Sequence, residues 1–184
     1  MTRYQAFDPN VELVGSTVFA FITNINHDDI QNILTRHNLG HIDPNGWYKL
    51  QDVLNVLSDI SAEENASQNL VAIGMAAAQL GLQRLPEEYK NATAEAWLRA
   101  YCDTIYVARH RNGLTGTLTL DRLSDRSLRL TMHSPYPDDL MYGVFYAYIR
   151  HFSHGKNFIL RYNESSPRRE HGGEKTIYEI ELGA

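Results

Sequence analysis

Residues 134–143 read Ser134-Pro-Tyr-Pro-Asp-Asp-Leu-Met-Tyr-Gly143, and they predict the start of a long helix. Pro137 suits the first turn of a helix, because a proline at that position has no N–H group to leave unpaired. Asp138 and Asp139 follow it, where negative charge is favoured by the positive end of the helix dipole. The apolar residues after them form a helical stripe broad enough to cover one face of a sheet: Leu140, Met141, Val144, Phe145, Tyr148, Ile149 and Phe152.

Two predicted strands precede this helix and two follow it. Leucines and threonines alternate across residues 114–120, which is the pattern of a half-buried strand. After a turn, residues 128–133 alternate in the same way and supply the partner strand of a hairpin. Residues 157–162 and 176–182 supply two more strands. The order along the chain is therefore strand, strand, helix, strand, strand.

The first 112 residues are predicted to be helical. Five helices are expected, over residues 11–24, from Asn26 to Gly40, over residues 47–57, from Asn65 or Ser67 onward, and over residues 92–110. Asn112-Gly113 ends the last of them, and the hydrophobic period then changes from about 3.6 residues to 2. Because no linker or repeat interrupts the 184 residues, we expect a single domain over 1–184. It has a helical part at 1–112 and a ββαββ part at 113–184.

Composition and motif spacing exclude several classes of function. A net charge of -5 argues against nucleic-acid binding, which normally needs a basic surface. The single cysteine, Cys102, permits neither an internal disulfide nor a cysteine-based zinc site. None of the 8 histidines has the close spacing of a metal motif, and no catalytic motif is present. With no apolar signal segment and no membrane span, we expect a cytoplasmic protein without metal ligands or catalytic residues.

The C-terminal block carries a family resemblance. It combines the hairpin, the Ser134-Pro-Tyr-Pro motif, Gly143, and Gly172-Gly-Glu followed by Thr176-Ile-Tyr-Glu-Ile. Over residues 92–182 the chain resembles the superfamily of 4-vinyl-reductase-type small-molecule-binding domains, H-NOX haem domains and small TRAPP subunits. The resemblance implies an α+β fold, in which an N-terminal helical part packs on a C-terminal four-stranded antiparallel sheet with one long helix. It also implies a ligand pocket between the helices and the sheet.

The chain departs from the H-NOX pattern at the positions that hold haem. H-NOX domains bind the haem propionates with a Tyr-x-Ser-x-Arg motif, and the equivalent residues here are Met132, Ser134 and Tyr136. Only the serine is kept, and no arginine is present there for bidentate pairing with a carboxylate. The proximal histidine would lie inside the predicted helix that ends at His110, yet His110 itself is expected at the frayed end of that helix. Haem is therefore disfavoured, and the cofactor stays unknown.

Aromatic residues predict what lines the pocket. The predicted lining residues are Trp97, Tyr101, Ile105, Met132, Tyr136, Leu140, Tyr148 and Phe158. Such a lining, with a few hydroxyl groups, fits a small hydrophobic or aromatic ligand. The alternative is that the tyrosines of the helix from Pro137 only pack in the core and cover its rim.

We therefore expect a small-molecule-binding sensory or regulatory domain that does not catalyse a reaction. It would pass its signal through a homodimer or to an output protein. One alternative is a gas sensor that binds haem or another tetrapyrrole with non-standard ligation. Another is a structural assembly subunit, as the TRAPP resemblance implies. An enzyme acting on a small hydrophobic substrate would need a buried titratable group that the sequence does not identify.

Overall fold

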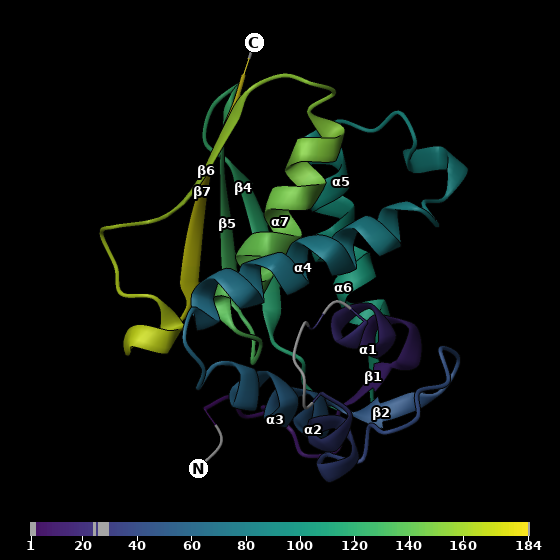
Figure 1. Ribbon diagram of the computed structural model, residues 1–184. Helices are drawn as coiled ribbons and strands as arrows, with labels where there is room; N and C mark the ends of the chain where they lie inside the picture. Colours follow the sequence, from purple (N-terminus) through teal and green to yellow (C-terminus); the bar gives the residue numbers. More distant parts are fainter. Residues whose placement is uncertain (1–2, 24, 26–29, 184) are drawn as a thin grey trace.

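The computed structural model describes residues 3–23, 25 and 30–183, and its helices cover one face of a four-stranded antiparallel sheet (Figure 1). The strands are β4 (Thr117–Arg122), β5 (Ser127–His133), β6 (Phe158–Tyr162) and β7 (Thr176–Leu182), in the order β4-β5-β7-β6. In the register of the sheet, Leu130 of β5 lies opposite Tyr178 of β7, and both side chains are fully buried. The predicted α+β class with a C-terminal four-stranded antiparallel sheet is confirmed.

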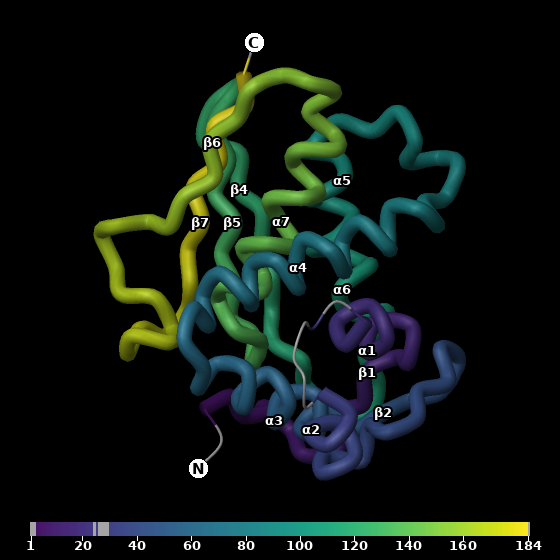
Figure 2. The backbone as a smooth tube through the Cα atoms, in the orientation of Figure 1, coloured from purple at the N-terminus to yellow at the C-terminus, as the bar shows by residue number. Residues whose placement is uncertain are grey.

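The long helix α7 (Asp138–Phe152) is a middle layer between the sheet and α4 (Ala66–Leu82). On the sheet side, the Phe145 ring lies 5.2 Å from the Tyr178 ring of β7. On the opposite side the α4 backbone crosses the α7 backbone (Figure 2). A Cβ atom built at Gly143 would lie only 2.1 Å from a carbonyl oxygen of α4, so the two helices are in backbone contact at the crossing.

The N-terminal part contains further helices and a second, smaller sheet. The helices are α1 (Gly15–Ile22), α2 (Ile30–Arg36), α3 (Leu50–Ile60), η1 (Glu87–Tyr89), α5 (Ala94–Ala100) and α6 (Tyr106–Ala108). The small sheet is antiparallel and consists of β1 (Glu12–Val14), β2 (Trp47–Lys49) and β3 (His110–Arg111), in the order β2-β1-β3. One more short helix, η3 (Arg169–His171), lies in the loop between β6 and β7.

Two of the predicted helices begin as strands, which corrects the prediction for residues 11–24 and 47–57. The first residues of both segments pair with each other as β1 and β2, so their backbone hydrogen bonds go to a neighbouring strand. Helix α1 begins at Gly15, where the chain passes close to the carbonyl oxygen of Asp43. A Cβ atom at Gly15 would lie 2.0 Å from that oxygen, so only glycine fits there. The predicted start of the second helix at Asn26 lies outside the described residues.

The predicted helix over residues 92–110 is interrupted in the structure. The hydroxyl of Thr93 caps α5 by accepting a hydrogen bond at 3.2 Å from the N–H of the third helical residue. A π-helical turn, η2 (Tyr101–Ile105), then separates α5 from α6. Such a turn adds one residue to the helical repeat and rotates the residues that follow it. His110 is therefore not at a frayed helix end, as predicted, but lies in β3 opposite Leu13 and is buried.

Candidate functional site

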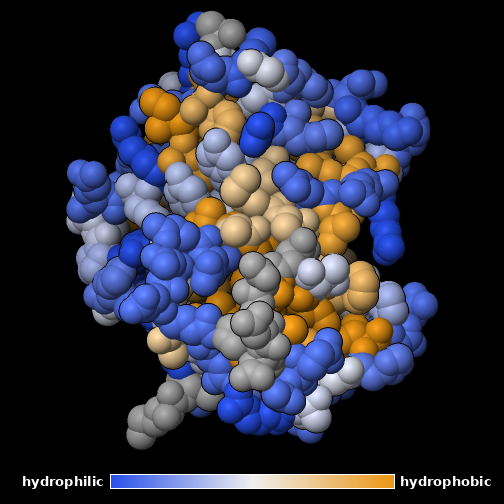
Figure 3. Space-filling view, in the orientation of Figure 1, coloured by the Kyte–Doolittle hydropathy of each residue, from blue (hydrophilic) through white to orange (hydrophobic). Residues whose placement is uncertain are grey.

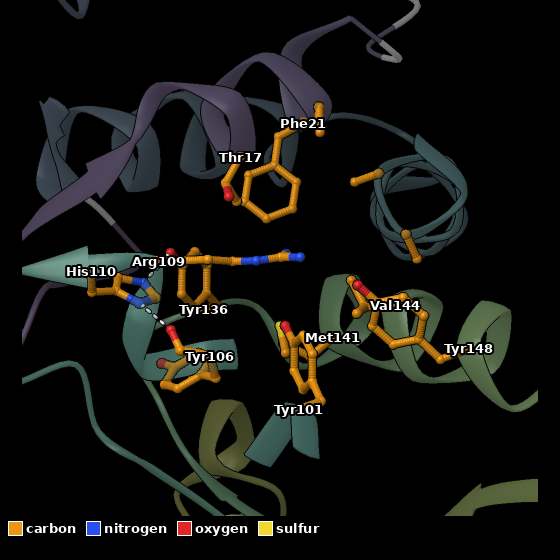
Figure 4. A pocket seen from close by; sticks show the side chains of 13 residues that line it. Thr17, Phe21, Tyr101, Tyr106, Arg109, His110, Tyr136, Met141, Val144 and Tyr148 are labelled. Atoms are coloured by element: carbon orange, nitrogen blue, oxygen red, sulfur yellow. Dashed lines mark hydrogen bonds between the residues drawn. The ribbon is translucent and has the colours of Figure 1, made fainter. Parts of the chain in front are cut away.

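Two neighbouring cavities lie on the side of α7 that faces away from the sheet. We call the smaller one the inner chamber; it has a volume of about 30 Å³, which is room for about two water molecules. Its walls come from α1, α4, η2, α6, β3 and α7 (Figure 4). The aromatic residues that line it are Phe21, Tyr101, Tyr106, His110, Tyr136 and Tyr148. The inner chamber is therefore an aromatic cavity with several hydroxyl groups in its walls.

We call the larger cavity the outer chamber, and it has a volume of about 480 Å³. It opens to solvent between α1, the C-terminal end of α4 and the α5–η2 segment, and Figure 3 shows apolar side chains in a hollow on that side of the molecule. Its apolar walls come from Phe19, Leu80, Leu85, Pro86, Trp97 and Ile105, among others. Four residues line both chambers: Thr17, Ala20, Ala77 and Arg109. The two chambers therefore meet at these four side chains.

Arg109 extends its side chain across this junction (Figure 4). Its guanidinium group lies beside the Tyr148 hydroxyl and 5.8 Å from the centre of the Tyr101 ring. Within the described part of the chain, no carboxylate forms an ion pair with Arg109, and no Asp or Glu lines either chamber. The junction therefore holds a half-buried cation whose partners are neutral phenol groups.

His110 forms two short hydrogen bonds that define its protonation. Its Nδ1 lies 2.8 Å from the carbonyl oxygen of Tyr106, which can only accept, so Nδ1 carries the proton. Its Nε2 lies 2.7 Å from the Tyr136 hydroxyl and therefore accepts the hydroxyl proton. Burial lowers the pKa of His110 to about 4, so the ring is neutral at neutral pH.

A second set of hydrogen bonds fixes the floor of the inner chamber. The Tyr106 hydroxyl donates to the carbonyl oxygen of Thr115 at 2.6 Å. Because that donation uses its one proton, it accepts the proton of the Ser134 hydroxyl, which lies 3.0 Å away. Burial raises the pKa of Tyr106 to about 12 and that of Tyr136 well above the usual value. These phenols therefore stay protonated and hold the wall of the chamber rigid.

The structure divides the eight predicted lining residues into three groups. Tyr101, Tyr136 and Tyr148 line the inner chamber, whereas Trp97 and Ile105 line the outer chamber. Met132 and Leu140 are fully buried in the core, and Phe158 packs with its ring 5.1 Å from the Tyr146 ring; none of these three lines either chamber.

The position of α7 explains this division. The prediction placed the pocket between the helices and the sheet, but no residue of β4, β5, β6 or β7 lines either chamber. Helix α7 fills the space over the sheet, and the inner chamber borders its other face through Met141, Val144 and Tyr148. Arg109 and Phe21 were not predicted as site residues, since an arginine at a helix end and an apolar α1 residue carry no sequence signal for a cavity.

The residues around the inner chamber leave no room for haem in the described arrangement. The inner chamber is far smaller than a porphyrin, and the Nε2 lone pair of His110 is already used by the Tyr136 hydroxyl. Ser134, the one residue kept from the propionate-binding motif, is fully buried and bonded to Tyr106. In the described arrangement these residues do not fit haem.

Other reactive groups lie away from the two chambers. Burial raises the pKa of the Cys102 thiol to about 12, so the thiol is protonated at neutral pH, and Cys102 lines neither chamber. Within residues 3–23, 25 and 30–183, no group of three or more His, Cys, Asp and Glu side chains is placed to hold a metal ion. None of the described helices is both long and apolar enough to cross a membrane.

Comparisons with known proteins show which solved structures share this fold. No protein-family model matches this chain, and no curated protein matches it. Among solved structures, one studied for haem distortion in the H-NOX family has a TM-score of 0.71 at 12% identity, covering 91% of this chain and 94% of its own. This chain has the H-NOX fold. An H-NOX variant from T. tengcongensis has a TM-score of 0.70 at 12% identity and covers 91% of this chain and 96% of its own.

A further H-NOX structure comes from K. algicida and is an unliganded Fe(II) protein. It has a TM-score of 0.67 at 14% identity and covers 94% of this chain and 97% of its own. These likenesses support the H-NOX part of the predicted resemblance as a fold. They add nothing for 4-vinyl-reductase-type domains or small TRAPP subunits. At such low identity, the chemistry of the site depends on this chain's own residues.

Proposed function

We propose that this chain is a small-molecule-binding sensory domain that uses the H-NOX fold without haem and does not catalyse a reaction. The outer chamber is the observation that carries the proposal. Its volume of about 480 Å³ lies within the range of about 300–1,000 Å³ typical of small-molecule sites. Apolar walls with a few polar groups at one end are also typical of such sites.

The absence of catalysis is proposed from the state of the titratable groups around the chambers. A general base needs a pKa near the working pH and an accessible lone pair. Burial keeps Tyr106 and Tyr136 protonated, and the Nε2 lone pair of His110 is already bonded. These groups therefore support binding better than proton transfer.

A sensory role is proposed from the elements that border the chambers. Segments distant in sequence (α1, the end of α4, and η2 with α6) each supply part of the lining. A ligand that contacts all of them stabilises one arrangement of these segments over others. A partner protein or a second copy of the chain that contacts α1 would then respond to the ligand.

A haem-binding gas sensor is the second candidate, and two observations favour it. The solved neighbours are H-NOX proteins, and some of them were studied for the distortion or the redox potential of their haem. His110 is also neutral and donates from Nδ1 to a backbone carbonyl, which is the usual arrangement of a histidine whose Nε2 binds a metal. This candidate requires that Tyr136 moves away from His110 and that the inner chamber opens.

The first test compares two substitutions at Gly81, which lines the outer chamber. A Cβ atom at Gly81 would lie 3.6 Å from the Tyr148 hydroxyl, an ordinary contact, so Gly81→Ala adds only a tolerated methyl group. Gly81→Phe adds a ring that occupies the chamber. We expect the neutral fluorescent probe N-phenyl-1-naphthylamine to bind the unaltered chain and Gly81→Ala alike, and to bind Gly81→Phe about tenfold or more weakly.

Equal probe binding by both variants contradicts the proposal, provided that circular dichroism shows Gly81→Phe to be folded. An absorption spectrum and native mass spectrometry of the freshly purified chain, with and without added haemin, test the second candidate. A stoichiometric Soret band that is lost in His110→Ala favours haem. The absence of a Soret band favours the haem-free domain.

A further inference from the structure

We propose that the ligand of this chain is an amphipathic carboxylic acid, whose carboxylate pairs with Arg109 and whose apolar body fills the outer chamber. This inference rests on the proposed function and adds the chemical class of the ligand. It comes from the charge of the lining, the state of Arg109 and the position of the apolar walls.

The lining of the outer chamber is positively charged in a protein of net charge -5. Its charged residues are Arg84 at the rim and Arg109 at the junction with the inner chamber. The described residues that line the two chambers include no Asp or Glu. An anion is therefore attracted to this cavity, whereas a cation is repelled from it.

Arg109 differs from several other arginines of this protein, because those arginines pair with a carboxylate. Arg3, Arg161 and Arg168 each lie within 3.0 Å of a carboxylate oxygen. Arg109 lies beside the Tyr148 hydroxyl and the face of the Tyr101 ring, and it forms no ion pair with a carboxylate in the described part of the chain. A half-buried guanidinium group pays a desolvation cost that neutral partners offset only in part. A ligand carboxylate would complete its coordination.

The geometry of a guanidinium group matches a carboxylate. Its planar fork of N–H groups matches two carboxylate oxygens in a bidentate pair. Thr17, which also lines both chambers, carries a hydroxyl group that can donate a hydrogen bond. The positive charge of Arg109 and its hydrogen-bond donors therefore lie at the inner end of the outer chamber, where it meets the inner chamber.

Apolar groups occupy the rest of the outer chamber. Leu80, Leu85, Trp97 and Ile105 line it, and Phe19 on α1 is 43% exposed at its edge. A hydrocarbon chain or ring placed here removes apolar surface from water on both partners. The cavity thus combines a cationic inner end with an apolar body, which is complementary to an amphipathic acid.

The test measures displacement of N-phenyl-1-naphthylamine by decanoate and by decanol, two molecules with the same chain and different head groups. We expect decanoate to bind the unaltered chain about 10- to 100-fold more tightly than decanol, the range for one charge-assisted hydrogen-bonded pair. In Arg109→Met the preference for decanoate disappears while decanol still binds. Arg109→Lys keeps part of the preference, because it keeps the charge without the fork. Arg36→Met, a remote arginine paired with Asp59, leaves the preference unchanged.

The outcomes separate this inference from the proposed function. If the probe binds and decanol displaces it as well as decanoate does, the carboxylate assignment is wrong and the cavity function stands. If the probe binds but neither molecule displaces it, the amphipathic class is wrong. If neither the probe nor decanoate binds, both proposals are overturned. Because the head-group comparison uses the unaltered chain, it does not depend on whether Arg109→Met folds.

Discussion

Acidification from pH 7 to pH 4 is expected to lower the free energy of unfolding by about 3 kcal/mol through His110 alone. Burial lowers the pKa of His110 from 6.5 to about 4 in the folded protein. Between these two values the unfolded chain binds a proton that the folded chain does not. The contribution is therefore fully present above pH 6.5 and is lost as the pH falls toward 4.

The measurement is a series of urea unfolding curves between pH 4 and pH 7, on the unaltered chain and on His110→Gln. The variant is less stable at pH 7, because it loses the hydrogen bonds to Tyr106 and Tyr136, but its stability falls less on acidification. His41→Gln, at an exposed position, is the matched control and keeps the full pH dependence. A His110→Gln profile with the same slope as the unaltered chain would show that His110 is not buried in the neutral state.

Gly143→Ala is expected to destabilise the fold by about 3 kcal/mol, the upper end of the usual cost of overpacking. The added Cβ atom would lie 2.1 Å from the carbonyl oxygen of Val71 in α4. That oxygen belongs to a helix backbone, so no side-chain rotation can relieve the overlap, and α4 must move away from α7. The denaturant midpoint of the variant measures the cost.

Gly81→Ala is the control for this prediction, because it makes the same chemical change in helix α4 itself. The nearest atoms to its Cβ would be 3.6 and 3.8 Å away, so no overlap arises. Replacing glycine by alanine within a helix is expected to stabilise the protein by about 0.5–1 kcal/mol. If both variants shift stability in the same direction, backbone contact between α4 and α7 is not what requires glycine at 143.

The C-terminal part could be predicted from local patterns. Alternating burial along β4 and β5 has a period of two residues, and the apolar stripe of α7 has a helical period. Each pattern extends over enough residues to identify its element. The ββαββ order and the four-stranded antiparallel sheet follow from them, and the structure confirms both.

The small sheet could not be predicted in this way. Strands β1, β2 and β3 contain three, three and two residues, too few for a periodic pattern. They become strands because segments distant in sequence meet and pair. His110 shows the consequence, since its place in β3 rather than at a helix end is what buries it and lowers its pKa.

The candidate site likewise has features that the sequence could predict and features that only the tertiary structure shows. Tyr101, Tyr136 and Tyr148 were predicted as lining residues because aromatic residues crowd segments that were expected to meet, and the structure places these three at the inner chamber. The sequence could not distinguish the two apolar faces of α7, one of which packs on the sheet while the other borders the inner chamber. Nor could it show that Arg109 lies between two chambers without a carboxylate partner in the described chain. Residue type and spacing are local properties, whereas burial, cavities and charge partners depend on which distant segments fold together.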